Sequence, residues 1–429
     1  MEVNTVNKIG GEVIIPGDKS ISHRAAIISS LTENTVNIKN FLLSRDCLNT
    51  LQLLKDTGVE IENSNGNIVV YGKGIKNFHD PSDVLYAGNS GTLIRIACGV
   101  LSSANITAVI TGDESVNSRP MKRIIEPLRE MGAKIFGRED NSRAPIIILP
   151  AGKLKGRSFS IPVASAQIKS SILLAGLAAD DPTEIIQPEA SRDHTERMLE
   201  FFGADISYDG KYAKVNPGKR LKGKNLYIPG DLSSALYFII ASLIVPGSRV
   251  SMRNIGVNPS RSFVLDILRS MGARIEIENV KSINNEPVAD IVSCSSRLHA
   301  VKIDRKAIPS IIDEIPALCV ASAFAEGETI IEGAEELRHK ESDRISSIYS
   351  GFLKAGVNIR QNPDGLVICG NPYFKTGEGI YESYGDHRIA MSLAIMGLRS
   401  SGNIKITNSA CIETSFPDFV YELKKATAS

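Results

Sequence analysis

The sequence lacks the features that would assign it to nucleic-acid binding, membrane insertion or secretion. Its 429 residues include 49 basic and 48 acidic side chains, a net charge of +1, so the basic excess of a generic nucleic-acid-binding protein is missing. No apolar run approaches the roughly 18 residues that a membrane span needs, and the polar N-terminus has no signal-peptide core. The six cysteines show no CxxC spacing. We therefore expect a cytoplasmic protein with reduced thiols and no nucleic-acid or membrane partner.

Common phosphate-binding motifs and metal-site spacings are also missing. The sequence GDKS resembles part of a P-loop, but Asp18 separates Gly17 from Lys19 and the full motif is not met. A GxGxxG motif followed by a distal acid is absent, which argues against a dinucleotide-binding fold. The six histidines have no metal-ligand spacing, so no metal site is predicted. His194 and His387 each follow an aspartate; we expect a structural role for His194, whereas His387 fits a structural or an active-site role equally.

What the sequence does contain is a repeated pattern of a helix end, a glycine and an alternating strand. This pattern is typical of a helix that ends with a left-handed glycine before a strand. It occurs five times, with the glycines 69–84 residues apart: Gly58, Gly132, Gly203, Gly272 and Gly356.

A second repeated pattern is a small or polar helix start followed by a run rich in Ala, Leu and Ile. Because these runs are apolar nearly all round, we expect buried helices, with amphipathic companions outside them. Six copies in phase predict six α/β units, the last cut short by the C-terminus. The copies are 68–80 residues apart and start at Ser20, Ser90, Ser165, Ser233, Asp313 and Asp386.

The sequence IPGD occurs twice and divides the chain. Each copy precedes a serine and a buried-type helix. Pro-Gly is also a common turn, but the economical interpretation is two α/β domains of three units each. The boundaries that this implies are 17–229 for one domain, 1–16 plus 230–429 for the second, which includes the N-terminal strand, and hinge crossings near 16–18 and 228–231.

Positively charged residues recur at or near the predicted helix starts, where backbone N–H groups and the helix dipole already favour an anion. Cations gathered there would repel one another unless a polyanion bound between them. Salt bridges within the protein are the alternative, and we expect them to neutralise only some of the charges. The cations are Lys19, Arg24, Arg95, Arg119, Lys169, Arg192, Arg338, Lys340, Arg344 and Arg388. The possible internal partners are Asp18, Asp46, Asp343 and Asp386.

Carboxylates in the second half of the chain are candidates for proton transfer. Asp313 and Glu314 open a buried helix before Pro316. Glu341 lies between two cations, and Asp386 precedes Arg388. An enzyme that moves protons at carbon needs such carboxylates close to its substrate.

Seven motifs, in order along the whole chain, resemble those of 5-enolpyruvylshikimate-3-phosphate synthases. The resemblance implies an α/β fold of two similar domains, each a threefold βαβαββ repeat (an inside-out α/β barrel), with the active site in the interdomain cleft. It implies transfer of the enolpyruvyl group of phosphoenolpyruvate to shikimate 3-phosphate, by a monomer without a metal or organic cofactor. The motifs are PGDKSISHRA (16–25), GNSGTLIR (88–95), NSRPM (117–121), SAQIKS (165–170), KESDR (340–344), YGDHRIAM (384–391) and SFPDF (415–419).

The resemblance also implies roles for individual residues. Asp313 would take the proton from the 5-hydroxyl, Glu341 would deliver a proton to C3, and Lys19 would touch both substrates. The residues implied for shikimate 3-phosphate are Lys19, Ser20, Arg24, Ser165, Gln167, Arg192, Asp313 and Lys340. Those implied for phosphoenolpyruvate are Lys19, Gly91, Arg119, Gln167, Arg344, Asp386 and Arg388.

The chain departs from the family pattern at two positions. Thr414 stands where some members have a lysine near the C-terminal motif, so the phosphoenolpyruvate phosphate would have one cation fewer or another partner. His339 stands where the family usually has an apolar residue, and we expect it to be tolerated. Gly91 argues for an open pocket, and tolerance to the inhibitor glyphosate stays open.

Two alternatives share the predicted fold. The sister enolpyruvyl transferase that acts on UDP-N-acetylglucosamine uses a loop cysteine before an arginine, and the corresponding loop here, GDESVNSRPM, has no cysteine. A catalytically inactive anion-binding protein would be expected to have lost one of the key side chains, yet Lys19, Asp313, Glu341 and Arg388 are all present.

Overall fold

Glycines end five of the helices in the structure, a computed structural model that describes residues 1–428. Gly58, Gly132, Gly203, Gly272 and Gly356 all have φ between +80° and +95°. This left-handed backbone favours glycine and ends a helix before the chain turns into a strand. The pattern predicted from the sequence is confirmed at all five positions.

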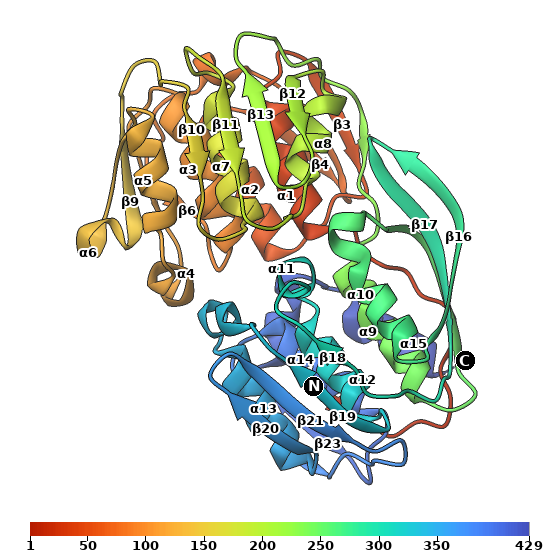
Figure 1. The fold of residues 1–429 in the computed structure, drawn as a ribbon. Helices are drawn as coiled ribbons and strands as arrows, with labels where there is room; N and C mark the ends of the chain where they lie inside the picture. The colour runs from red at the N-terminus through yellow and green to blue at the C-terminus, as the bar shows by residue number, and fades with distance from the viewer. Residues whose placement is uncertain (429) are drawn as a thin grey trace. The chain divides into compact units, whose positions relative to one another are not determined.

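Six inner helices, which carry their labels in Figure 1, have side chains that are buried on almost every side, and this confirms the prediction of six buried helices. Because their sequences carry Ala, Leu and Ile on all faces, they are stable only when covered by other elements. One start differs from the expectation, since the fifth helix begins two residues after Asp313. The inner helices are α1 (Lys19–Ser30), α3 (Gly91–Ser103), α7 (Ala166–Gly176), α9 (Leu232–Ile244), α12 (Ile315–Ala323) and α14 (His387–Gly397).

Six outer helices bury one face only. In α5, for example, Ile124, Ile125 and Leu128 are buried while Lys122 is half exposed. The outer helices are α2 (Arg45–Asp56), α5 (Lys122–Glu130), α8 (His194–Phe201), α10 (Pro259–Ser270), α13 (Arg344–Ala355) and α15 (Phe419–Thr427). The remaining helices are short: α4 (Glu114–Ser118), α6 (Arg138–Asn141), α11 (Ile308–Ile311), η1 (Ile75–Asn77), η2 (Glu335–His339) and η3 (Ser409–Thr414).

Three four-stranded sheets share one topology in the first half of the chain. Two parallel strands are joined through an inner helix, and an antiparallel hairpin that follows the outer helix completes each sheet. The first sheet takes its parallel partner strand, β14, from the end of the third repeat. The sheets are β14 (Leu226–Tyr227), β3 (Thr35–Lys39), β5 (Asn67–Tyr71), β4 (Glu60–Ser64); β6 (Leu85–Tyr86), β7 (Ala108–Thr111), β9 (Arg143–Leu149), β8 (Lys134–Gly137); and β10 (Ser158–Ser160), β11 (Thr183–Ile186), β13 (Tyr212–Asn216), β12 (Asp205–Tyr208).

The second half of the chain repeats this topology, with help from the N-terminus. The N-terminal β2 runs parallel to β15, and β1 pairs with β23. The four-stranded sheets are β2 (Gly10–Glu12), β15 (Arg249–Gly256), β17 (Glu286–Cys294), β16 (Arg274–Ile283); and β18 (Lys302–Ile303), β19 (Gly327–Ile331), β21 (Gly365–Gly370), β20 (Asn358–Asn362). The third sheet has three strands, β22 (Gly379–Glu382), β23 (Ile404–Thr407) and β1 (Glu2–Val3).

The described chain divides into two units, each with its own hydrophobic core. Unit 1 contains Met1–Pro16, Pro229–Lys281 and the described chain from Pro287 onward, and unit 2 contains Gly17–Ile228 and Ser282–Glu286. The second part of unit 2 is the tip of the β16–β17 hairpin. Hydrogen bonds hold this tip, because the amide of Asn284 donates to the carbonyl of Tyr227 at 2.7 Å.

Candidate active site

The start of α1 combines a carboxylate cap with a cation. Asp18 is the N-cap residue, and its Oδ1 accepts a hydrogen bond from the backbone N–H of Ile21 at 2.9 Å. Lys19 is the first residue of the helix, and its Nζ lies 2.5 Å from Oδ2 of the buried Asp46 on α2. An aspartate considered in the sequence as an internal partner therefore neutralises part of the charge at this helix start.

Arg24, later in α1, is buried and donates hydrogen bonds to three neighbours. They are Oγ1 of Thr195 at 2.7 Å, Oγ of Ser170 at 2.9 Å and the carbonyl of Ser20 at 2.9 Å. Burial lowers the pKa of Arg24 to about 10, and the nearby positive charge of Arg192 acts in the same direction. The structure thus brings the predicted residues Ser20, Arg24 and Arg192 together, and the nearby carboxylates Glu196, Asp18 and Glu286 only partly offset the cost of burying the Arg24 charge.

A second group of predicted residues gathers at the starts of α3 and α7. Gly91 is the first residue of α3, and a Cβ there would lie 2.6 Å from NH1 of Arg119. A larger residue would therefore displace this guanidinium. Oε1 of Gln167 accepts a hydrogen bond from NH1 of Arg95 at 2.6 Å, and Ser165 is the N-cap residue of α7. Gly91, Arg119 and Gln167 are brought together, with Arg95 as a further cation that the family motifs did not assign to a substrate.

His23 lies between the two cations of α1 and is fully buried. Its Nδ1 is 2.6 Å from Oγ1 of Thr50, and its Nε2 is 3.3 Å from Oγ of Ser90, the N-cap residue of α3. Burial lowers the pKa of His23 well below 6.5, and the charges of Lys19 and Arg24 lower it further. The ring therefore stays neutral at neutral pH and adds no charge to these helix starts.

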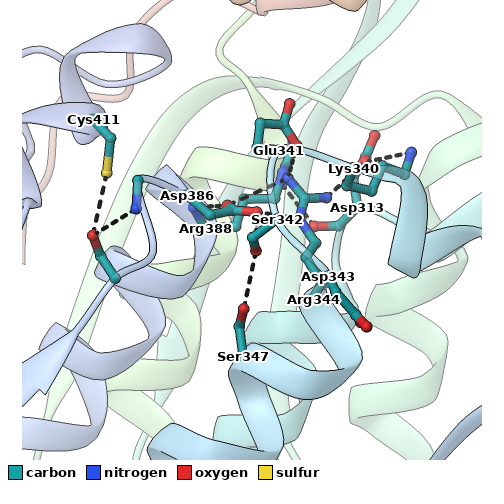
Figure 2. A network of polar contacts seen from close by, with 12 residues as sticks. Asp313, Lys340, Glu341, Ser342, Asp343, Arg344, Ser347, Asp386, Arg388 and Cys411 are labelled. Atoms are coloured by element: carbon teal, nitrogen blue, oxygen red, sulfur yellow. Dashed lines mark hydrogen bonds and ion pairs between the residues drawn. The ribbon is translucent and has the colours of Figure 1, made fainter. Parts of the chain in front are cut away.

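In unit 1 the candidate residues surround Arg344 (Figure 2). The side chain of Arg344 is only 1% exposed. Nε of Arg344 donates to Oδ2 of Asp386 at 2.8 Å, and NH2 donates to Oε2 of Glu341 at 2.5 Å. NH1 donates to Oδ1 of Asp313 at 3.3 Å. Burial opposes the positive charge, but the three carboxylates together raise the pKa of Arg344 above its ordinary value. One guanidinium thus contacts three of the carboxylates that the sequence analysis named as candidates for proton transfer.

Two further cations approach Asp313 (Figure 2). Nζ of Lys340 lies 3.4 Å from Oδ1 of Asp313, and NH1 of Arg388 donates to its carbonyl at 2.8 Å. The backbone N–H of Arg388 donates to Oδ1 of Asp386, the N-cap residue of α14, at 2.8 Å. Burial opposes the charge of Arg388, but Asp313 raises its pKa overall. The predicted residues of unit 1 therefore form one continuous polar network.

Two of the cations near helix starts are held by structural ion pairs. Nζ of Lys169 lies 2.5 Å from Oε1 of Glu196, and both side chains are only 1% exposed. NH1 of Arg338 donates to Oδ2 of Asp343 at 2.7 Å. Asp343 was considered in the sequence as an internal partner, whereas Glu196 was not, so internal ion pairs neutralise at least one cation more than the sequence suggested.

The structure also locates the remaining predicted positions. His194 is buried with its Nδ1 2.8 Å from Oε1 of Glu286, as expected for a structural role. His339 is exposed at the end of η2, where an apolar residue is not required. Oγ1 of Thr414 donates to the carbonyl of Cys411 at 2.7 Å and so closes its own turn of η3.

Sequence reasoning missed a second buried arginine in unit 1. Arg261 lies on the buried face of α10 with Val264, Leu265 and Leu268, where an apolar residue is the usual choice. A cation at an i, i+3, i+4, i+7 apolar position is the signal that could have identified it.

The structure gives no sign of two other kinds of site. Within residues 1–428, no group of three or more His, Cys, Asp or Glu side chains is placed to hold a metal ion. In the same range, no helix combines the length and apolar character needed to cross a membrane.

Comparison with known proteins decides the family. Residues 3–423 match the family described as EPSP synthase (3-phosphoshikimate 1-carboxyvinyltransferase). This chain belongs to that family. A 3-phosphoshikimate 1-carboxyvinyltransferase from Petrotoga mobilis is 48% identical, over 99% of both chains. One from Syntrophomonas wolfei is 46% identical, over 97% of both chains. The family predicted from the seven motifs is confirmed.

Solved structures agree with this assignment. An EPSP synthase from Acinetobacter baumannii is 41% identical, with a TM-score of 0.89 over 99% of this chain and 97% of that one. The enolpyruvyl transferase NikO from Streptomyces tendae is 17% identical, with a TM-score of 0.79 over 99% and 96%, and shares the fold. The predicted α/β fold class and the assignment to the enolpyruvyl transferases are therefore confirmed.

Proposed function

We propose that this chain transfers the enolpyruvyl group of phosphoenolpyruvate to the 5-hydroxyl of shikimate 3-phosphate and releases phosphate. Membership of the EPSP synthase family supports this activity. One observation carries the assignment of residues to it: a single buried guanidinium, that of Arg344, holds Asp313, Glu341 and Asp386. Carboxylates gathered on one cation supply the proton acceptor and donor that addition and elimination at carbon require.

The cationic helix starts of unit 2 suit shikimate 3-phosphate. Arg24 and Arg192 lie near each other, and burial makes the charge of Arg24 costly even with Glu196, Asp18 and Glu286 nearby. A phosphate would gain charge-assisted hydrogen bonds from these guanidinium groups. The proposed residues for this substrate are Lys19, Ser20, Arg24, Ser165, Gln167 and Arg192 of unit 2, with Asp313 and Lys340 of unit 1.

Phosphoenolpyruvate brings a phosphate and a carboxylate. Arg119 beside Gly91 offers one cation for them, and Arg344 and Arg388 offer two more. Preorganised cations stabilise the negative charge that shifts onto the leaving phosphate. The proposed residues for this substrate are Lys19, Gly91, Arg119, Gln167, Arg344, Asp386 and Arg388.

Asp313 and Glu341 carry the proton transfers in this proposal. Asp313 accepts the proton of the 5-hydroxyl while the hydroxyl oxygen bonds to C2 of phosphoenolpyruvate. Glu341 gives a proton to C3 of phosphoenolpyruvate, and the product of this addition is a tetrahedral intermediate. Elimination returns a proton from C3 to Glu341 and breaks the C2–O bond to phosphate, and the departing phosphate takes the proton that Asp313 had accepted. An adjacent guanidinium favours the ionised carboxylate, so Arg344 has to loosen its 2.5 Å contact with Glu341 before Glu341 can donate. The carboxylate of phosphoenolpyruvate, by competing for Arg344, would loosen it.

The proposal assigns each substrate residues from both units. It therefore requires the units to meet over the substrates, which would exclude water from the reaction. A monomer in the cytoplasm, without a metal or organic cofactor, completes the proposal. Sedimentation of the protein with and without both substrates would check the monomer.

Phosphate release from phosphoenolpyruvate and shikimate 3-phosphate tests the activity directly. We expect release that needs both substrates and continues in the presence of a metal chelator. Release with UDP-N-acetylglucosamine in place of shikimate 3-phosphate would favour the sister transferase. Binding of shikimate 3-phosphate with no release under any condition would favour an inactive anion-binding protein.

A further inference from the structure

A second buried arginine links the starts of two inner helices in unit 1. Arg261 lies in the first turn of α10, and its side chain is 4% exposed. Its NH2 donates to Oδ1 of Asp231 at 2.7 Å and to Oγ of Ser233 at 2.5 Å. Its Nε lies 3.7 Å from Oε1 of Glu314, which also accepts a hydrogen bond from Ser233. One guanidinium therefore lies between two carboxylates.

Both carboxylates belong to helix starts. Asp231 is the N-cap residue of α9, where its Oδ1 accepts a hydrogen bond from the backbone N–H of Ser233 at 2.9 Å. Glu314 occupies the N-cap position of α12. Asp231 is 3% exposed and Glu314 is 1% exposed. Buried carboxylates of this kind are tolerated only with a compensating cation and hydrogen bonds, and Arg261 supplies that charge.

This cluster adjoins the proposed proton acceptor through the chain itself. Glu314 directly follows Asp313, whose side chain contacts Lys340 and Arg344. A movement of Glu314 shifts the backbone that carries Asp313. The negative charge of Glu314 also lies next to the carboxylate that has to be ionised to accept a proton.

We propose that Arg261 is a positioning residue for the enolpyruvyl transfer: it anchors Glu314, and with it Asp313, and balances the charge of Glu314. This inference rests on the proposed function, because it takes Asp313 as the proton acceptor. It differs from the role of Arg344, which contacts the reacting carboxylates directly.

Charge-matched variants test the inference. Arg261→Gln keeps hydrogen-bond donors near Asp231 but removes the charge, so we expect kcat to fall about ten- to hundredfold while KM for both substrates changes less than about threefold. The acidic limb of the kcat–pH profile should move to higher pH by about half a unit or more, because the unbalanced charge of Glu314 disfavours ionisation of Asp313. Glu314→Gln alone should move the same limb to lower pH.

The most decisive test removes the charges of Arg261 and Glu314 together, so that the local net charge is restored. In the double variant Arg261→Gln/Glu314→Gln, the acidic limb should return to within about 0.3 pH unit of the unmodified protein, with a recovery of kcat relative to Arg261→Gln. Arg269→Gln is the matched control on the same helix. Its half-exposed side chain contacts the exposed Asp266 at 3.5 Å and donates to the carbonyl of Ile275 at 3.2 Å, so this variant should leave kcat and the pH profile unchanged. Circular dichroism and the melting temperature establish that each variant is folded.

Two results would overturn the inference. The first is a folded Arg261→Gln variant with the kcat and pH profile of the unmodified protein. The second does not depend on that variant folding: an active Glu314→Gln protein whose acidic limb stays in place. Failure of the unmodified protein to release phosphate from the two substrates would instead contradict the proposed function.

Discussion

The two units place opposite charges at the starts of their inner helices. In unit 2 the cation is on the inner helix and the carboxylate on the outer one: Lys19 with Asp46, and Lys169 with Glu196. In unit 1 the carboxylate caps the inner helix and the arginine is on the outer one: Asp231 with Arg261, and Asp386 with Arg344. The same repeated fold therefore has its ion pairs arranged in opposite directions in the two units.

Helix physics explains what this reversal does. The N-terminus of a helix carries partial positive charge, so a carboxylate there is stabilised and a cation is not. In unit 1 the aspartate caps Asp231 and Asp386 accept hydrogen bonds from the starts of α9 and α14. In unit 2 α3 and α7 have neutral caps, Ser90 and Ser165, while α1 has Asp18 followed at once by Lys19. In the proposed reaction, unit 2 therefore contributes cations at its helix starts, whereas unit 1 contributes the proton-transferring carboxylates together with the cations that hold them.

The largest expected effect comes from removing the central arginine of unit 1. Arg344→Gln should lower phosphate release about a thousandfold, as for loss of a preorganised cation. It should also lower the free energy of unfolding by about 3–5 kcal/mol, because the fully buried Asp386 loses its charged partner. Enzyme assays and urea unfolding measure the two effects.

A surface arginine provides the control for this variant. Arg360 pairs with Glu328 at 3.0 Å, and both side chains are largely exposed, so Arg360→Gln should change stability by less than about 1 kcal/mol. Comparable losses in the two variants would mean that the buried network of unit 1 has no special role.

The next effect separates proton transfer from binding within unit 1. Glu341→Gln keeps the shape of the side chain and a contact for Arg344 but removes the proton that is donated to C3. We expect turnover to fall about a hundredfold while shikimate 3-phosphate binds normally. Steady-state kinetics with Glu328→Gln as the exposed control measure this, and near-normal turnover would remove Glu341 from the proton path.

A smaller effect compares two lysines of unit 2 that pair in the same way. Lys19→Met should raise KM for both substrates and lower kcat, each by about tenfold or more, because Lys19 is proposed to touch both. Lys169→Met should mainly lower stability, by about 3–5 kcal/mol, since Lys169 and Glu196 are both 1% exposed. Kinetics and urea unfolding of both variants distinguish the roles, and matching kinetic defects would show that the two pairs are equivalent.

The smallest effect concerns His23 and the pH dependence of stability. Burial lowers its pKa well below 6.5 in the folded protein, so the unfolded chain binds a proton that the folded chain does not. Stability from this group is present above pH 6.5 and is lost as the pH falls below it, by about 1.4 kcal/mol between pH 7.5 and 5.5. His23→Gln should remove that part of the loss. Urea unfolding at both pH values measures the difference, and an unchanged pH dependence would contradict it.

Local chemistry explains what the sequence could predict. A glycine at a helix end has a backbone requirement that a single residue reveals, and all five such glycines have positive φ. The inner helices could be predicted because a helix with apolar residues on all of its faces is stable only when it is buried. The candidate site residues around Lys19, Glu341 and Asp386 could also be predicted, because they lie in contiguous motifs whose residue types and spacing are read directly along the chain.

Long-range pairing explains what the sequence could not predict. The two-residue strand β14 pairs with β3, far away in the chain, and two residues have no detectable period. The tip of the β16–β17 hairpin belongs to unit 2 although its strands belong to unit 1, and no composition change marks that division. The ion pairs of Lys169 and Arg261 join separate helices, so neither partner identifies the other in the sequence.

Titration calorimetry with shikimate 3-phosphate alone tests the division of roles between the units most directly. In the absence of phosphoenolpyruvate, Arg24→Gln of unit 2 should weaken binding about tenfold or more, because it loses a charge-assisted contact with the phosphate. Glu341→Gln of unit 1 should bind within about threefold of the unmodified protein despite its lost turnover. Normal binding by Arg24→Gln, or equally weak binding by both variants, would contradict the account.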